Sequence, residues 1–233
     1  MIIKSCSAWF IFREWTGDTS ARAFFFTEHF GLLSCLYKGG RTPKKQALLQ
    51  PFTPLWLNFS ELRGRYYVRS IEQQAPALQL KGISLFSGLY LNELIYHALK
   101  KTESEPRLFQ AYHMALNHLA LTQESKKIEK VLRRFEWVLL QACGHHFSLA
   151  EEGITGEPVR AGRCYQYQSG IGLILADKGI PGAHLLALAV DDLSEDAFLK
   201  SAKQIMRHAI DNLLEGKEIK ARSLFSKAVC RES

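Results

Sequence analysis

The chain has 233 residues, enough for one large domain or two small ones. Hydrophobic residues make up 47% and charged residues 23%, a globular composition that excludes a disordered chain. The formal net charge of +7 implies an acidic partner, which is nucleic acid, an anionic membrane or an acidic protein. Most of the surplus lies in residues 1–80, which hold ten Lys or Arg residues against five Asp or Glu residues.

The cysteines and the apolar segments indicate the cellular location. The five cysteines are scattered and include no C-x-x-C pair, which fits a reducing cytosol rather than a disulfide framework. No signal peptide is evident, and no apolar run approaches the roughly 20 residues needed to span a bilayer. We therefore expect a cytoplasmic protein with no membrane partner.

Short strands are predicted for the first seventy or so residues, where turn signals such as Gly17-Asp18, Gly39-Gly40 and Arg63-Gly64 separate aromatic and aliphatic segments. Five short strands in this length favour a small barrel or sandwich, and the oligonucleotide-binding (OB) barrel is the commonest five-stranded candidate. The predicted strands are Ser7–Phe12, Ser20–Thr27, Phe30–Tyr37, Phe52–Phe59 and Tyr66–Ile71.

Helices are predicted after Pro76, where the hydrophobic period changes from two to about 3.6. The clearest is Ser125–Cys143, whose apolar residues repeat at intervals of three and four. Residues 143–190 are rich in glycine, with Cys164–Tyr167 and Ile171–Leu175 as a possible hairpin. The other predicted helices are Leu85–Leu99, Arg107–Leu121 and Glu195–Leu214.

A basic loop between the third and fourth predicted strands is the first candidate binding site. Lys38, Arg41, Lys44 and Lys45 lie within nine residues that contain no acid. Glycines in this loop let the backbone approach a ligand closely, and phosphates are the obvious counter-charge. The alternative is a solvated loop that is basic by chance.

The last predicted strand interleaves cations with aromatic residues. Arg63, Arg65 and Arg69 alternate with Tyr66 and Tyr67, and single-stranded nucleic acid is bound by cations along its backbone and by aromatic rings under its bases. Adjacent tyrosines on a strand point to opposite faces, so at most one of them stacks on a base. The sequence does not indicate which one.

The helix Ser125–Cys143 carries a second candidate site. Lys126, Lys130, Arg133 and Trp137 lie opposite its main apolar face. Either another element covers this tryptophan or a partner does. A basic rim around an aromatic residue suits a short acidic peptide that ends in an apolar side chain.

No constellation of catalytic residues is evident. Cys143, His145, His146 and Cys164 suggest a zinc site, but their spacing matches no ordinary structural-zinc pattern. The chain has no phosphate-binding P-loop, no nucleophile elbow and no zinc-protease motif. We therefore expect a protein with no catalytic residues, no metal and no cofactor.

Four segments, in this order, make the sequence resemble the bacterial DNA-repair family RecO over essentially its whole length. They are Gln50–Leu55 (QPFTPL), Gly88–Leu94 (GLYLNEL), Leu132–Glu136 (LRRFE) and Ile219–Phe225 (IKARSLF). The resemblance implies an α+β fold: an N-terminal five-stranded OB barrel in residues 1–78, followed by a C-terminal α-helical bundle in residues 79–233. A small irregular insertion is expected at residues 144–190. Many family members bind zinc there through four cysteines, and this chain, with only Cys164 in that stretch, is similar to the zinc-free branch.

The resemblance also implies the partners. Family members bind single- and double-stranded DNA, anneal complementary strands, and work with RecR to load RecA onto DNA coated by single-stranded-DNA-binding protein (SSB), whose acidic tail they bind. The expected DNA-binding residues are Lys38, Arg41, Lys44, Lys45, Arg63, Arg65, Tyr66, Tyr67 and Arg69. The expected SSB-tail residues are Lys126, Lys130, Arg133, Arg134 and Trp137. The protein would then be cytoplasmic, associated with the nucleoid and not an enzyme. A zinc-containing nucleic-acid-processing enzyme and a purely protein-binding adapter remain alternatives.

Overall fold

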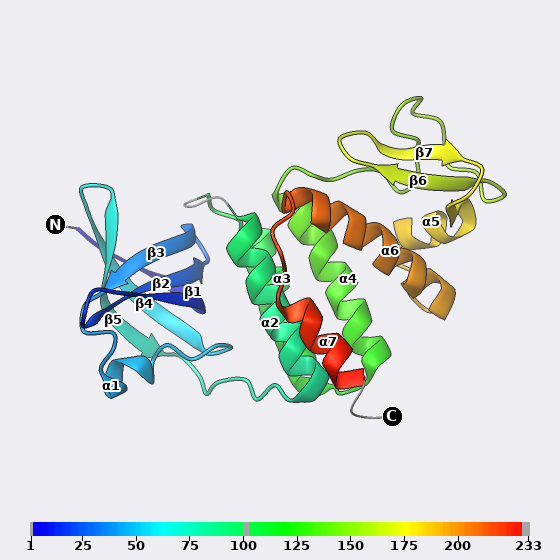
Figure 1. Cartoon of the computed structure of the whole chain (residues 1–233). Coiled ribbons are helices and arrows are strands. Elements are labelled where there is room, and N and C mark those ends of the chain that lie inside the picture. The colour runs from blue at the N-terminus through cyan, green and yellow to red at the C-terminus, as the bar shows by residue number, and fades with distance from the viewer. Residues whose placement is uncertain (1, 100–102, 230–233) are drawn as a thin grey trace. The chain divides into compact units, whose positions relative to one another are not determined.

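A computed structural model describes residues 2–99 and 103–229 (Figure 1). Within these residues the chain divides by its internal contacts into two compact units. The first comprises the residues up to Glu124 and those from Ile219 onward, and the second comprises Ser125–Glu218. The helices predicted to form one C-terminal domain are thus shared between the units, and the domain boundary near residue 78 stays a prediction.

The first unit contains a closed barrel with the strand order β1-β2-β3-β5-β4, which confirms the predicted five-stranded barrel. A parallel pairing of Cys35 with Tyr66 and of Leu36 with Tyr67 joins β3 to β5 and closes it. The strands are β1 (Ile3–Thr16), β2 (Ser20–Thr27), β3 (Gly31–Tyr37), β4 (Pro54–Leu62) and β5 (Arg65–Gln73), with a short helix α1 (Pro43–Gln46) between β3 and β4.

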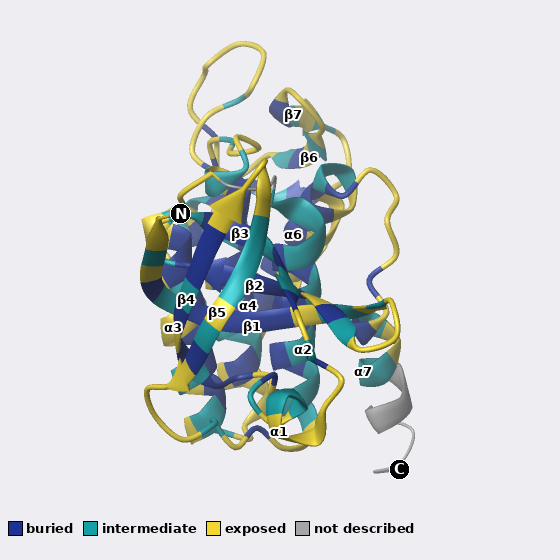
Figure 2. Ribbon diagram, turned by 90° about the vertical axis from the view of Figure 1, so that its left-hand side faces the viewer, coloured by how far each residue is buried: buried dark blue, intermediate teal, exposed yellow. Residues whose placement is uncertain are grey.

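The barrel core follows from alternation along the strands, since successive side chains point to opposite faces. Phe25, Leu33, Leu57 and Phe59 are among the buried residues that fill it. β2 and β3 are mostly buried and β5 is mostly intermediate, whereas the turn residues between the strands are largely exposed (Figure 2). Burial also raises the pKa of the Cys35 thiol to about 12, so this thiol is protonated and unreactive at neutral pH.

The first two long helices of the first unit pack on β1 and β2, and its last helix packs on the first of them. The Asn92 side-chain amide donates a hydrogen bond to the Ile11 carbonyl at 3.3 Å, and the Tyr112 hydroxyl donates to the Asn92 side-chain oxygen at 2.6 Å. Phe26 packs against Phe109 with 5.4 Å between ring centroids. Buried polar groups are thus paired where helices meet the barrel. These helices are α2 (Gly82–Ala98), α3 (Pro106–Leu121) and α7 (Ala221–Val229).

The second unit is built on the predicted helix Ser125–Cys143, which packs against the last long helix. The predicted hairpin is confirmed as β6 and β7, but the glycine-rich segment is more regular than expected because it also forms β8 and α5. The elements are α4 (Ser125–Ala142), β6 (Cys164–Gln168), β7 (Gly172–Ala176), β8 (Ile180–Pro181), α5 (Gly182–Ala189) and α6 (Asp196–Leu213). None of the described helices is both long enough and apolar enough to cross a membrane.

Candidate functional site

The basic loop after β3 is held against the turn between β1 and β2. The Arg41 amide donates a hydrogen bond to the Thr19 carbonyl at 3.1 Å, and the Lys45 ammonium donates to the Lys38 carbonyl at 2.6 Å. Gly40 is required for this close approach, because a Cβ at that position would lie 2.9 Å from the Tyr37 carbonyl oxygen. The loop cations are therefore presented by an ordered segment.

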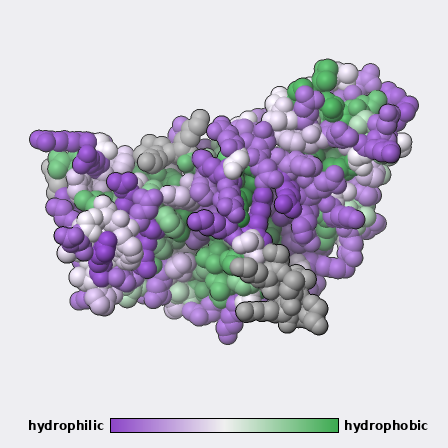
Figure 3. Space-filling view, in the orientation of Figure 1, coloured by the Kyte–Doolittle hydropathy of each residue, from purple (hydrophilic) through white to green (hydrophobic). Residues whose placement is uncertain are grey.

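The loop cations are also unneutralised. Lys38, Arg41 and Lys44 are exposed, Lys45 is half-buried over the Tyr37 ring at 5.0 Å, and none of the four forms an ion pair with another described residue. In Figure 3, hydrophilic and intermediate residues together cover most of the visible barrel surface. Unpaired cations gathered on one surface attract a polyanion.

The structure separates the two tyrosines of β5. Tyr66 packs against Phe59 in the barrel core, with 5.8 Å between ring centroids, and burial is the main cause that raises its pKa. Tyr67 therefore lies on the outer face of the strand, which it shares with Arg65 and Arg69. Of the two predicted stacking residues, Tyr67 is the one that points away from the barrel core, and both are half-buried.

The remaining predicted cations of the barrel lie on β5 and in the turn before it. Arg69 donates a hydrogen bond from Nε to the Ser60 hydroxyl at 2.8 Å, which fixes its side chain along the strand. Arg63 lies in the turn between β4 and β5, at a φ of 52°, next to the strand end where Lys4 and Glu61 form an ion pair at 3.7 Å. The parallel pairing places the start of β5 beside the end of β3, directly before the basic loop. Because the two strands run in the same direction, Tyr67 lies beside Leu36, two residues before the loop, whereas Arg65 and the turn at Arg63 lie farther from the loop.

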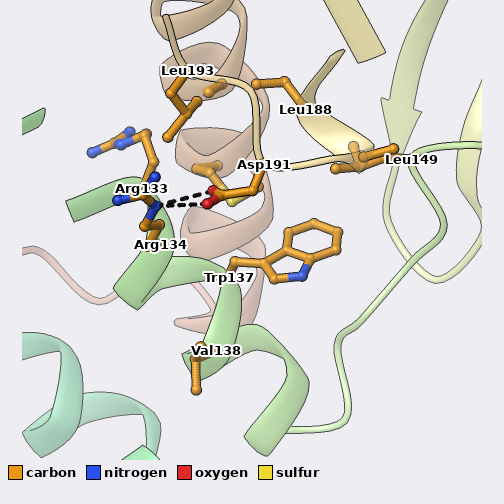
Figure 4. A pocket seen from close by; sticks show the side chains of 11 residues that line it. Arg133, Arg134, Trp137, Val138, Leu149, Leu188, Asp191 and Leu193 are labelled. Carbon is orange, nitrogen blue, oxygen red and sulfur yellow. Dashed lines mark hydrogen bonds and ion pairs between the residues drawn. The ribbon is translucent and has the colours of Figure 1, made fainter. Parts of the chain in front are cut away.

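A pocket of about 260 Å³ opens in the second unit (Figure 4). Arg133, Arg134 and Trp137 of α4 line one side of it, so three of the five predicted peptide-binding residues come together there. Trp137 also packs its edge on Phe147 at 5.2 Å between ring centroids, so another segment covers part of its ring. The other lining residues are mostly apolar: Val138, Leu149, Leu188, Ala189, Asp191, Leu193, Ala202 and Met206.

The cations around this pocket already have acidic partners. Arg133 is buried and its guanidinium donates to Glu136 at 2.8 Å, while its Nε has no hydrogen-bond partner among the described residues. Arg134 donates from Nε to both carboxylate oxygens of Asp191, at 2.9 and 3.0 Å (Figure 4). An acidic ligand at this pocket would share or displace these partners.

Lys126 and Lys130 do not line the pocket. Lys126 is exposed and pairs with Asp196 at 2.8 Å. Lys130 is near Asp192, whose pKa is lowered chiefly by hydrogen bonds from Ser194 and also by the charge of this lysine. These two predicted peptide-binding residues therefore lie outside the cavity.

The comparisons with known proteins cover nearly the whole chain. The family described as "Recombination protein O C terminal" matches residues 80–223. A protein of Legionella pneumophila (strain Corby) named DNA repair protein RecO is 56% identical over 98% of this chain and 100% of its own length. Relatives of the same name from Marinobacter nauticus and Actinobacillus pleuropneumoniae (serotype 7) are 36% and 35% identical over 92% and 91% of this chain and 90% of their own lengths.

The chain belongs to the RecO family. The resemblance found in four short segments is thereby confirmed, as is the barrel followed by helices. For the RecO-type zinc site, the described residues offer no cluster of three or more His, Cys, Asp or Glu side chains that could hold a metal ion. The absence of a cofactor remains a prediction.

One exposed aromatic residue of this RecO-family barrel was not singled out from the sequence. Trp15 lies near the end of β1, beyond the predicted strand end at Phe12, and it is 45% exposed. The charged residues Arg13 and Glu14 interrupt the apolar segment, so the sequence did not predict that the strand continues past Phe12. A period-two pattern would have revealed it, because Arg13 and Trp15 share one face and Glu14 points to the other.

Proposed function

We propose that this chain is a recombination mediator in DNA repair that has no chemistry of its own. It binds single- and double-stranded DNA through the barrel, anneals complementary strands, and works with RecR to help load RecA onto SSB-coated single-stranded DNA. The proposal combines family membership with the distribution of charge in the molecule.

The proposal that the barrel binds DNA rests mainly on which cations have acidic partners and which do not. The cations of the basic loop have no acidic partner within the described residues, whereas in the second unit Lys126, Lys203 and Arg134 each pair with a carboxylate. A surface salt bridge is neutral at a distance, but unpaired cations release counterions from DNA when they bind its phosphates. Two strands neutralised on one such surface repel each other less, which favours annealing.

Oligonucleotide binding by the intact protein should depend steeply on salt. Each phosphate contact with single-stranded DNA contributes about 0.7 to the slope of log K against log salt concentration. With the four loop cations engaged, we expect a slope of roughly −3. Fluorescence anisotropy of a labelled oligonucleotide measures it between about 50 and 300 mM salt. Binding that is absent at low salt would favour the purely protein-binding adapter, and binding that ignores salt would contradict the phosphate contacts.

We also propose that the pocket on α4 binds the acidic, Phe-terminated tail of SSB. The apolar lining suits a phenylalanine ring, and the buried Arg133 Nε without a partner among the described residues suits a carboxylate. A bound tail would either displace Asp191 from the Arg134 Nε or use the remaining N–H donors of this guanidinium.

Trp137→Ala should weaken this peptide binding by about tenfold or more, because a buried tryptophan is the side chain that most often dominates an interface. The measurement is a titration of a labelled acidic peptide that ends in Phe. Trp56→Ala, at a half-exposed barrel tryptophan, is the matched control and should bind like the wild type. Equal affinity of the Trp137 variant and the wild type would exclude this pocket as the tail site.

A further inference from the structure

Two guanidinium groups lie near the ring of Trp15 at the end of β1. The guanidinium carbon of Arg13 lies 4.6 Å from the centroid of its ring, and that of Arg41 lies 5.1 Å from it. Arg13 is two residues earlier on the same strand, whereas Arg41 comes from the basic loop. Two distant parts of the sequence thus converge on one indole ring.

The neighbouring strands leave this ring accessible. Trp15 pairs with Ala21 of β2, and Ala21 pairs with Tyr37 of β3. The methyl group of Ala21 is too small to cover the indole, so Trp15 remains 45% exposed. Tyr37 at the other end of this row has Lys45 over its ring. Ala21 and Tyr37 are buried, so Trp15 is the exposed ring of this row.

The arrangement is poorly explained as packing alone. Arg13 and Arg41 are like charges at a single ring, and neither forms an ion pair within residues 2–99 and 103–229. Their mutual repulsion and the exposed apolar surface would both be relieved by a ligand that has an aromatic face and flanking negative charges. A nucleotide with an unpaired base has this chemistry.

We propose that Trp15 is a stacking platform for an unpaired base and that Arg13 and Arg41 bind the phosphates on either side of it. This inference rests on the proposed DNA binding by the barrel and deepens it. Stacking on a base is stronger than an exposed cation–π contact, so a guanidinium can leave the ring for a phosphate. Because bases in a duplex are already stacked on each other, Trp15 would favour single-stranded over double-stranded DNA.

Trp15→Ala should weaken binding of a single-stranded oligonucleotide by about tenfold and change binding of the matching duplex by less than about twofold. The slope of log K against log salt should stay as in the wild type, because no phosphate contact is removed. Trp56→Ala is the matched control: Trp56 is 37% exposed on β4, with no cation over its ring among the described contacts. It should bind both DNAs like the wild type.

Trp15→Tyr keeps an aromatic face and should retain most of the single-strand affinity, which guards against a variant that fails to fold. Trp15→Phe should in addition lose most of the tryptophan quenching that single-stranded DNA causes in the wild type. Equal weakening for single strands and duplex, or no weakening for either, would overturn the platform while leaving DNA binding by the barrel intact. Absence of DNA binding by the wild type would instead remove the proposed function itself.

Discussion

Replacing Lys38, Arg41 and Lys44 together by alanine is expected to lower the affinity for single-stranded DNA by roughly 100-fold or more at about 50 mM salt. Each lost phosphate contact with a single strand removes about 0.7 from the salt slope. Three contacts therefore remove about 2 from the slope and more than two decades of affinity at this salt concentration. Duplex affinity should also fall, since phosphates are common to both forms of DNA. The three side chains are exposed, so the free energy of unfolding should change little.

A triple variant with the same change in net charge provides the control. Lys126, Lys203 and Arg207 are exposed cations of the second unit, and each lies within 4 Å of a carboxylate. Their replacement by alanine lowers the net charge equally but removes cations that are already neutralised. We expect DNA affinity within a few-fold of the wild type. Similar losses in both triple variants would indicate that total charge, and not the basic loop, determines binding.

The barrel could be predicted because patterns within short segments of the sequence specify its strands. Turn residues, aromatic content and period-two alternation together specify short strands, and the ends of β2 were predicted as the structure has them. The C-terminal end of β1 was not, because the charged residues Arg13 and Glu14 interrupt the apolar segment. Their burial pattern depends on α2, where Tyr96 donates a hydrogen bond to Glu14 at 3.0 Å. Such a contact across 82 residues leaves no local signal in the sequence.

The candidate site residues also divide into those that a local sequence pattern predicts and those that depend on contacts between distant residues. The loop cations were predicted from composition, and the structure adds that they are unpaired and close to Trp15. For α4, helical periodicity placed Arg133 and Trp137 opposite the apolar face, which suggested an exposed basic rim. The burial of Arg133 depends on Glu136, whose position three residues later is compatible with an ion pair but does not by itself indicate burial. The contact of Arg134 with Asp191 spans 57 residues, so no local pattern in the sequence indicates it.

Arg133→Met is expected to destabilise the second unit by about 3–5 kcal/mol, because it leaves the Glu136 carboxylate buried without its cation. The side chain of Glu136 is 1% exposed and that of Arg133 is 9% exposed. Urea unfolding followed by circular dichroism measures the change in the free energy of unfolding. A change below about 1 kcal/mol would mean that this pair is not buried in solution.

The double variant Arg133→Met, Glu136→Leu should recover most of that loss, since apolar side chains of similar size replace a buried ion pair at little cost. It also separates folding from binding at the pocket. The single variant would lose affinity for an acidic peptide merely by unfolding, whereas the double variant keeps the fold and the apolar lining but lacks the guanidinium. If Arg133 contacts the peptide carboxylate, the double variant should bind about tenfold or more weaker than the wild type although its stability is restored. If it binds like the wild type, the role of Arg133 is to neutralise Glu136, and the carboxylate is bound by Arg134, which already holds the Asp191 carboxylate with the same Nε.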